Sequence, residues 1–210
     1  FVMSNVSQEL MLTDLSSLKL VQDTQHLTPA CQDALVQILK YSQTPTSQGL
    51  FLHGPMGSGK TTLNEILTRQ IDPLCRVITI ENPSELRLLR YNNEKTKDYV
   101  INDVLQYESV PDEDDSSPAT MENLLINAMR QSPHWIGPGE LRSPGEFATA
   151  LRAAQTGHYF FTTLHAEGDD DAIYRFLTAY LMISDEPAEL ALRNICNAIK
   201  FVIYHEKLAD

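Results

Sequence analysis

One segment, Gly54–Thr61, constrains the fold of this chain more than any other part of its sequence. It fits the pattern G-x-x-x-x-G-K-[ST] in full, and it lies between a short apolar run at 50–52 and a segment with helical apolar spacing at 61–70. Glycines in such a loop allow positive φ angles, so successive backbone N–H groups can turn inward around a phosphate. The following helix points its positive N-terminal end at the same anion. The segment therefore predicts a strand, a phosphate-binding loop and a helix.

The same loop predicts which side chains hold a nucleoside triphosphate such as ATP. Lys60 is expected to reach the β- and γ-phosphates, and Thr61 is expected to bind Mg²⁺ through its hydroxyl. The predicted binding residues are Gly54, Pro55, Met56, Gly57, Ser58, Gly59, Lys60, Thr61 and Thr62. The loop alone indicates nucleotide binding and no more, because kinases, motors, GTPases and transport ATPases share it.

A second strand, rich in β-branched residues, is predicted at 76–80, and together with the first strand, loop and helix it opens a parallel α/β sheet. The remaining expected elements are helices from Thr28 and over 84–92, 119–131, 143–155, 170–182 and 187–197, and strands at 159–163 and 200–204. Residues 1–27 are weakly patterned and read as a linker or the remnant of a preceding domain. Residues 28–210 are expected to form one domain.

Charge and composition narrow the class of partner. The net charge is −12 with Lys and Arg scattered, so the surface repels nucleic acid phosphates, which disfavours DNA motors and predicts no nucleic acid partner. No apolar run approaches the roughly 18 residues of a membrane span, so direct membrane insertion is not expected, although a protein partner at a membrane is.

Three distant cysteines predict neither zinc nor disulfides, fit a reducing cytosol, and are expected to be buried. The acidic stretch 108–115 predicts a solvated loop, with a cation-binding loop as the alternative.

Two glutamates each follow a predicted strand, at the edge where parallel sheets bind ligands. Glu81, in TIENPSE, can orient a water or metal-bound water, or can cap a turn. Glu140, in IGPGELR, can polarise an attacking water as general base or support the Mg²⁺ shell. The strand before Glu140 is expected to be weak, because Gly137-Pro138 interrupts its apolar run.

Two histidines, His158 and His165, bracket the strand predicted at 159–163. Because they lie at opposite ends of that strand, they are not expected to share a metal ion. Each can instead contact phosphate or a catalytic carboxylate, or can play a purely structural part.

Taken in order, these segments resemble the secretion ATPase superfamily, whose members power type II and type IV secretion, conjugation, and pilus extension and retraction. GPMGSGKTT resembles its Walker A box and TIENPSE its aspartate box. GELRSPGEFATALRAAQTGH resembles its Walker B segment running into its histidine box, which TTLHAEG completes. The resemblance covers roughly residues 45–205. It implies a RecA-like α/β fold with a mainly parallel sheet flanked by helices, a homohexameric ring and Mg²⁺-dependent ATP hydrolysis.

The resemblance also assigns roles by position. Glu140 matches the catalytic glutamate. His158 and His165 match the histidine-box pair, which supports the active site and its coupling to neighbouring subunits. The remaining matches are the aspartate-box acids and the arginines after and before the Walker B segment: Glu81, Glu85, Arg142 and Arg130.

Four departures from the family pattern bear on activity. Asn82 replaces the usual aspartate, which is expected to lower hydrolysis, and Gly137-Pro138 replaces aliphatic residues. Ser143 replaces the acid that follows the arginine, and the family's N-terminal domain is largely missing. The segment RSPGEF is closer to the conjugation and type IVB branch than to the pilus retraction branch.

The leading hypothesis is a cytoplasmic ATPase motor, associated peripherally with the inner membrane through a platform or secretion-channel protein. Asn82 and the interrupted strand favour an alternative, a nucleotide-binding structural or regulatory subunit with weak hydrolysis. A small-molecule kinase would need an arginine-rich lid, for which only Arg87 and Arg90 are candidates. A RecA-type recombinase is disfavoured by the acidic charge.

Overall fold

Six strands form one sheet, and all of its pairings are parallel. The computed structural model describes residues 49–68, 71, 75–86, 88, 103–110, 117–166 and 169–206, together with positions 29, 33 and 37. The strands lie in the order β3-β2-β4-β5-β1-β6. Their bounds are β1 (Gly49–His53), β2 (Arg76–Glu81), β3 (Asp103–Glu108), β4 (Trp135–Pro138), β5 (Tyr159–Leu164) and β6 (Phe201–Tyr204). The predicted α/β class is confirmed, and the described sheet is wholly parallel where a mainly parallel one was expected.

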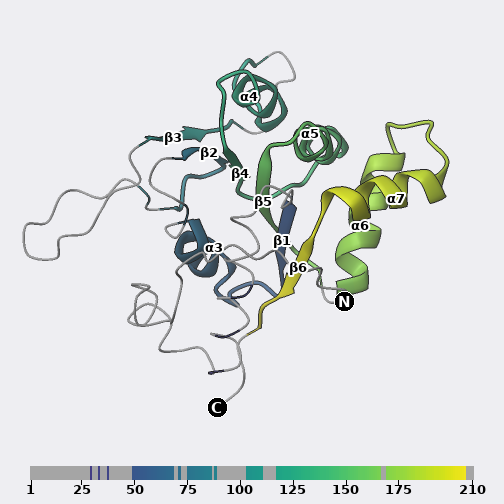
Figure 1. Cartoon of the computed structure of the whole chain (residues 1–210), viewed down its shortest axis with the longest axis horizontal. Coiled ribbons are helices and arrows are strands. Elements are labelled where there is room, and N and C mark those ends of the chain that lie inside the picture. Colours follow the sequence, from purple (N-terminus) through teal and green to yellow (C-terminus); the bar gives the residue numbers. More distant parts are fainter. Residues whose placement is uncertain are drawn as a thin grey trace, which may run out of the picture.

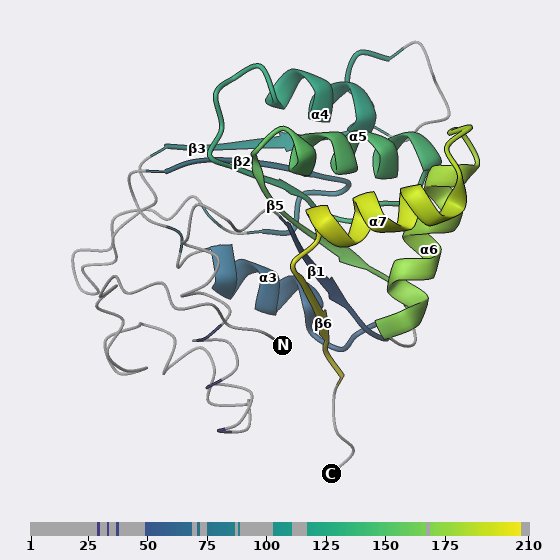
Figure 2. The same cartoon turned by 45° about the vertical axis from the view of Figure 1, so that its right-hand side comes forward.

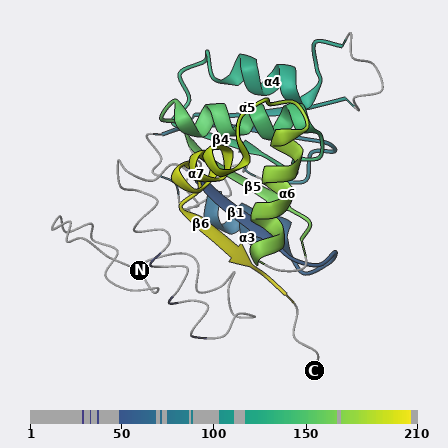
Figure 3. The ribbon, with the colours of Figure 1, turned by 90° about the vertical axis from the view of Figure 1, so that its right-hand side faces the viewer.

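Helices cover both faces of this sheet. One face carries α3 (Lys60–Thr68), and the other carries α4 (Met121–Ala128), α5 (Pro144–Gln155), α6 (Asp169–Leu181) and α7 (Ala188–Ala198) (Figures 1 and 2). Figure 3 shows α5, α6 and α7 grouped in front of the strands. Parallel strands buried on both faces need this arrangement, because neither face can be left to water.

Alternation along β1 shows how the core is divided between the two faces. Leu50 and Leu52 pack in the cluster that includes α3, whereas Phe51 between them packs in the cluster of α5, α6 and α7. Phe51 is fully buried, and its ring centroid lies 5.3 Å from that of Phe176 on α6. The phosphate loop that follows β1 is therefore anchored by a strand fixed from both sides.

The pairing of β4 with β5 contains one irregularity. Between the pairing of Ile136 with Phe160 and the bridge of Glu140 with Thr163, β4 contributes one residue more than β5. This is a β-bulge, and it includes Pro138, which has no N–H to donate to the neighbouring strand. Bulges redirect the side chains that follow them, so the proline helps to set where Glu140 points.

The preceding glycine also has a packing role. A Cβ on Gly137 would come within 2.7 Å of the Phe161 ring of the adjacent strand, so the glycine makes room for that ring. All four residues of β4 are buried, and their pairing with β2 is unbroken. The strand expected to be weak is therefore formed and buried, and its pairing continues through Gly137-Pro138 on the β2 side and ends at Ile136 on the β5 side.

Most predicted elements occur within about two residues of their expected bounds, but three expectations fail. β3 was not predicted, and its last residue, Glu108, belongs to the stretch expected to be a loop. No helix covers the described part of 84–92, namely residues 84–86 and 88. Cys196 is exposed rather than buried, and Cys75 is partly buried.

Other expectations concern parts of the chain that the structure describes only in part. The helix from Thr28 falls almost wholly outside the described residues, of which 29, 33 and 37 are helical. Residues 111–115 of the acidic stretch, Cys31 and the two lid candidates, Arg87 and Arg90, also lie outside them. Within the described residues, no helix combines the length and apolar character that crossing a bilayer requires.

Candidate functional site

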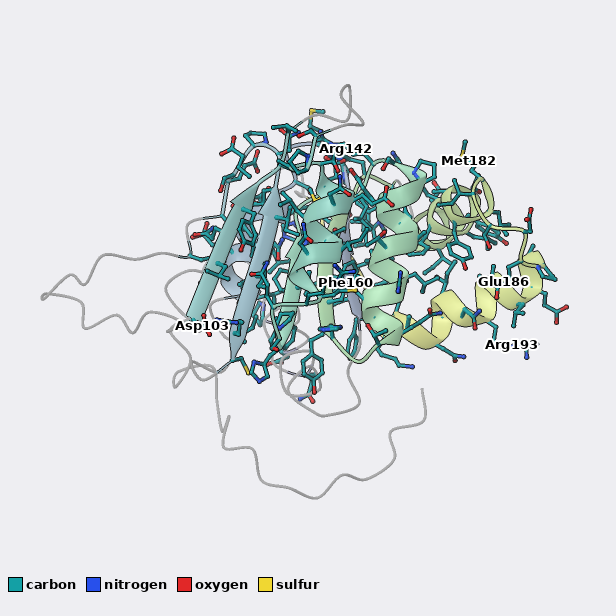
Figure 4. The ribbon with its side chains drawn as sticks, turned by 90° about the horizontal axis from the view of Figure 1, so that it is seen from above. Asp103, Arg142, Phe160, Met182, Glu186 and Arg193 are labelled. Carbon is teal, nitrogen blue, oxygen red and sulfur yellow. The ribbon has the colours of Figure 1, made fainter. Side chains whose placement is uncertain are left out.

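The carboxyl ends of the strands meet at one edge of the sheet, and a cavity of about 460 Å³ lies there. In Figure 4, Arg142 lies at this edge and Asp103, the first residue of β3, at the opposite one. The cavity is lined by Met56, Gly57, Gly59, Lys60, Thr61, Thr62, Asn64, Glu81, Asn82, Pro83, Glu85, Gly139, Glu140, Arg142, Thr163 and His165. Segments far apart in the sequence are thus brought around one space, at the edge where open α/β sheets bind ligands.

The phosphate loop connects β1 to α3 through three glycines with positive φ. These angles are 147° at Gly54, 74° at Gly57 and 98° at Gly59. A Cβ on Gly54 would collide with the carbonyl oxygen of His205, the residue after β6, whereas a Cβ on Gly57 would meet nothing within 4 Å. Gly54 is therefore required by packing as well as by φ, and Gly57 by φ alone.

Lys60 and Thr61 begin α3 and point their polar groups toward the loop and the cavity. The Lys60 ammonium donates hydrogen bonds to the carbonyl oxygens of Gly54 (2.9 Å) and Pro55 (2.7 Å). Burial lowers the pKa of Lys60, and the negative charge of Glu140 partly offsets that effect. The Thr61 hydroxyl donates to Glu85 Oε2 at 2.9 Å, which leaves its oxygen lone pairs available to a cation.

Glu140 is held from both of its oxygens. Arg142 donates to Glu140 Oε2 from Nε (3.1 Å) and Nη2 (2.9 Å), and His165 Nε2 lies 3.4 Å from Oε1. The Glu140 side chain is 22% exposed, whereas that of Arg142 is 60% exposed. The backbone is fixed as well, because the Thr163 amide and hydroxyl both donate to the carbonyl oxygen of Gly139.

Glu81 is used differently. It is buried at the end of β2, and its carboxylate accepts hydrogen bonds from the Leu86 amide and the Ser84 hydroxyl. Burial raises the pKa of Glu81, the amides of Leu86 and Glu85 and the Ser84 hydroxyl act in the opposite direction, and the Glu85 charge adds a further rise. The capped turn therefore forms, although no helix follows it in the described residues, and Glu81 also lines the cavity.

Two residues predicted from the sequence lie away from this cavity. His158 precedes β5, and its Nδ1 lies within hydrogen-bond distance of Thr156 Oγ1 and Ala153 O. Because the whole of β5 separates the two histidines, His158 lies about 20 Å along the strand from His165. Arg130 follows α4, next to Gln131, whose carbonyl oxygen accepts from Arg76 at the start of β2. The structure thus brings His165 to Glu140 and leaves His158 and Arg130 at the opposite edge.

Sequence reasoning missed one well-placed acid. Ser143 and Glu146 form a capping box at the start of α5, in which each side chain accepts from the other residue's backbone N–H. The same Glu146 oxygen also accepts from the Arg142 amide. The pattern S-x-x-E before an apolar run is a recognisable signal for such a box. Ser143, noted as a departure from the family pattern, is therefore the N-cap of α5.

The residues present fit a Mg²⁺-bound nucleotide. Positive-φ glycines form the cradle, Lys60 supplies a cation at its base, and Thr61 presents a hydroxyl that is hydrogen-bonded to Glu85. Within the described residues, no three His, Cys, Asp or Glu side chains form a metal cage.

Residues 7–208 match the family described as Type II/IV secretion system protein. Among curated relatives, the competence protein ComGA of Streptococcus pneumoniae is 30% identical over 150 residues, which are 71% of this chain and 42% of that protein. The type IV secretion system protein PtlH of Bordetella pertussis is 35% identical over 129 residues, 61% of this chain and 35% of that protein. The chain thus spans well under half the length of these relatives.

Solved structures share the fold. The ATPase DotB of Legionella pneumophila has a TM-score of 0.64 at 25% identity, covering 92% of this chain and 46% of that one. The pilus retraction motor PilT, solved with bound ADP, has a TM-score of 0.64 at 26% identity, covering 80% of this chain and 44% of that one. Because the family match runs through nearly the whole chain and these structures share its fold, this chain belongs to the type II/IV secretion system ATPase family.

Proposed function

We propose that this chain binds and hydrolyses Mg-ATP and serves as the ATPase of a secretion, conjugation or type IV pilus system. One observation carries the proposal. The phosphate loop with Lys60 and Thr61 shares a single cavity with Glu140, whose carboxylate is held by Arg142 and His165. A phosphate cradle and an oriented carboxylate in one cavity are the two parts that hydrolysis of a phosphoanhydride needs.

In this proposal each side chain has a defined task. Lys60 leaves the loop carbonyls to bind the β- and γ-phosphates, and its charge offsets theirs. Glu140 accepts a proton from the attacking water, while His165 and Arg142 fix the orientation of its two oxygens. Mg²⁺, when bound, supplies charge neutralisation at the phosphates, and the Thr61 hydroxyl would hold it there.

The larger-scale parts of the proposal rest on the family. We propose a homohexameric ring, an inner-membrane platform or secretion-channel protein as partner, and a cytoplasmic location at the membrane through that partner. Residues 28–210 would form the ATPase domain, with 1–27 as a linker or the remnant of a preceding domain. The similarity to PilT, a pilus retraction motor solved with bound ADP, supports the nucleotide and the mechanical role.

A second candidate is a nucleotide-binding structural or regulatory subunit with weak hydrolysis. Two observations favour it. Asn82 lines the cavity at the position where the family pattern has an acid. The carboxylate of Glu81 is already hydrogen-bonded to Leu86 and Ser84 in the turn that follows β2. The number of carboxylates available to a metal-bound water is lower as a result.

Steady-state phosphate release from Mg-ATP tests the proposal. Lys60→Ala is expected to abolish both ATP binding and turnover. Glu140→Gln is expected to lower kcat by about 100-fold or more while ATP stays bound, because it removes the base and keeps the shape of the side chain. Tight ATP binding without turnover by the unmodified protein, also in its assembled form, would favour the second candidate. Undiminished turnover by Glu140→Gln would exclude Glu140 as the base.

A further inference from the structure

Glu146 makes more contacts than capping of α5 requires. It is only 4% exposed, at the third position of the helix. In a capping box the acid accepts from the backbone N–H of the N-cap residue, and Glu146 Oε2 does so from Ser143 at 3.1 Å. The same oxygen also accepts from the amide of Arg142 at 2.5 Å, which lies one residue before the cap. This second bond is not part of the capping box, and it restrains the backbone of Arg142.

The residue fixed in this way is the one that holds Glu140. Arg142 reaches back two residues and donates to Glu140 Oε2 from both Nε and Nη2. Leu141 between them is 1% exposed and is packed in the core with Phe147 of α5, so the short segment has little freedom to compensate for a shift. Moving the Arg142 backbone therefore moves the guanidinium relative to Glu140.

The exposed side chain of Arg142 does little by itself to fix the position of its guanidinium. The Arg142 side chain is 60% exposed, and an ion pair with that much access to water contributes little to its own geometry. Pre-organisation must then come from the Arg142 backbone, whose amide is hydrogen-bonded to Glu146. A buried carboxylate that accepts two adjacent N–H groups supplies this restraint, because hydrogen bonds to a charged acceptor are short and strong.

We infer that Glu146 is a positioning residue for hydrolysis, acting through Arg142 to orient Glu140. The inference rests on the proposed function for its consequence in turnover, and on geometry alone for the link itself. The chain offers a matched control, since Ser143→Ala removes the reciprocal half of the same capping box, where Ser143 Oγ accepts from the Glu146 amide at 3.4 Å. That variant weakens the helix cap and leaves the Glu146 carboxylate in place.

Kinetics of four variants test the consequence. Glu146→Ala is expected to lower kcat about tenfold with KM for ATP nearly unchanged, because it misplaces a group that acts in the transition state. Ser143→Ala is expected to lower Tm and to keep kcat. Arg142→Ala and Arg142→Ala/Glu146→Ala are expected to turn over at the same rate, because Glu146 has no further effect once Arg142 is gone. Equal losses of kcat in Glu146→Ala and Ser143→Ala, or additive losses in the double variant, would overturn the inference.

Nuclear magnetic resonance tests the link without any turnover. In Glu146→Ala, hydrogen exchange at Arg142 Nε–H is expected to accelerate about tenfold and the Arg142 amide resonance to move, with neither change in Ser143→Ala. An unchanged Arg142 Nε–H in Glu146→Ala would overturn the inference whatever the kinetics. If the unmodified chain does not hydrolyse ATP, the proposed function fails, and this measurement still decides whether Glu146 positions Arg142.

Discussion

Glu140 and Glu81 follow strands at the same edge of the sheet, but their surroundings give them different chemistry. Glu140 is held by side chains that face the cavity, Arg142 and His165. Glu81 is buried and bonded to the turn that follows it. The sequence shows that both acids come at the ends of strands. It does not show the backbone path of the five residues that follow, and that path decides whether their amides reach the carboxylate. The role of Glu81 was therefore left between two readings.

Replacing Glu81 by Gln tests the burial of this acid. The folded-state pKa of Glu81 lies above its ordinary value of 4.5, so the folded protein binds the proton more tightly than the unfolded chain. This tighter proton binding stabilises the folded protein fully below pH 4.5, and the stabilisation is lost as the pH rises through the raised pKa. Glu81→Gln is expected to be more stable than the unmodified protein at about pH 7.5, with the gain vanishing at about pH 4, in urea unfolding.

The matched control is Glu189→Gln on α7, because that side chain is 93% exposed and the chemical change is identical. A gain in stability at the higher pH as large as that of Glu81→Gln would show that the effect does not come from burial of the acid. A Glu81→Gln variant that loses stability at the higher pH would show that the hydrogen bonds to the charged carboxylate outweigh its burial.

At the scale of elements, success followed the strength of the apolar pattern. β1, β2 and β5 were predicted because each contains an uninterrupted run of apolar or β-branched residues, most of which are buried. β3 was missed because it is an edge strand whose sequence, DVLQYE, mixes three polar residues with three apolar ones and is only half-buried. β4 was judged weak because single-sequence rules penalise Gly and Pro in a strand, whereas the bulge accommodates Pro138 and the Phe161 ring fills the space left by Gly137.

A double-mutant cycle tests the packing of β4. Gly137→Ala is expected to destabilise the protein by about 1–3 kcal/mol, because its Cβ would lie 2.7 Å from the buried Phe161 ring. Phe161→Leu removes ring atoms from that space. The double variant is expected to be less destabilised than the sum of the single changes, measured by urea unfolding. Strictly additive effects would show that the two residues do not compete for the same volume.

At the scale of the whole molecule, strand order decides which predicted residues meet. In a parallel sheet the ligand edge is formed by residues at and after the carboxyl ends of the strands. Glu81, Glu140 and His165 lie there, whereas His158 precedes its strand and lies at the other edge. The sequence already placed the two histidines at opposite ends of one strand, and the structure brings only His165 to Glu140. The residues that tie the site together, Glu85 to Thr61 and Glu146 to Arg142, depend on turns that sequence periodicity does not describe.

Nucleotide binding is expected to stabilise the entire fold, because the loop joins β1 to α3 and contacts the residue that follows β6. A ligand that binds only the folded state at 100 times its Kd adds about 2.7 kcal/mol, which for a chain of this size raises Tm by roughly 5–10 °C. Differential scanning fluorimetry with Mg-ATP is expected to show that rise in the unmodified protein and in Glu140→Gln, which retains the cradle. Lys60→Ala is expected to show none, since Lys60 supplies the cation at the base of the loop. An equal rise in Lys60→Ala would mean that ATP binds elsewhere on the chain, and the phosphate loop would lose its assigned role.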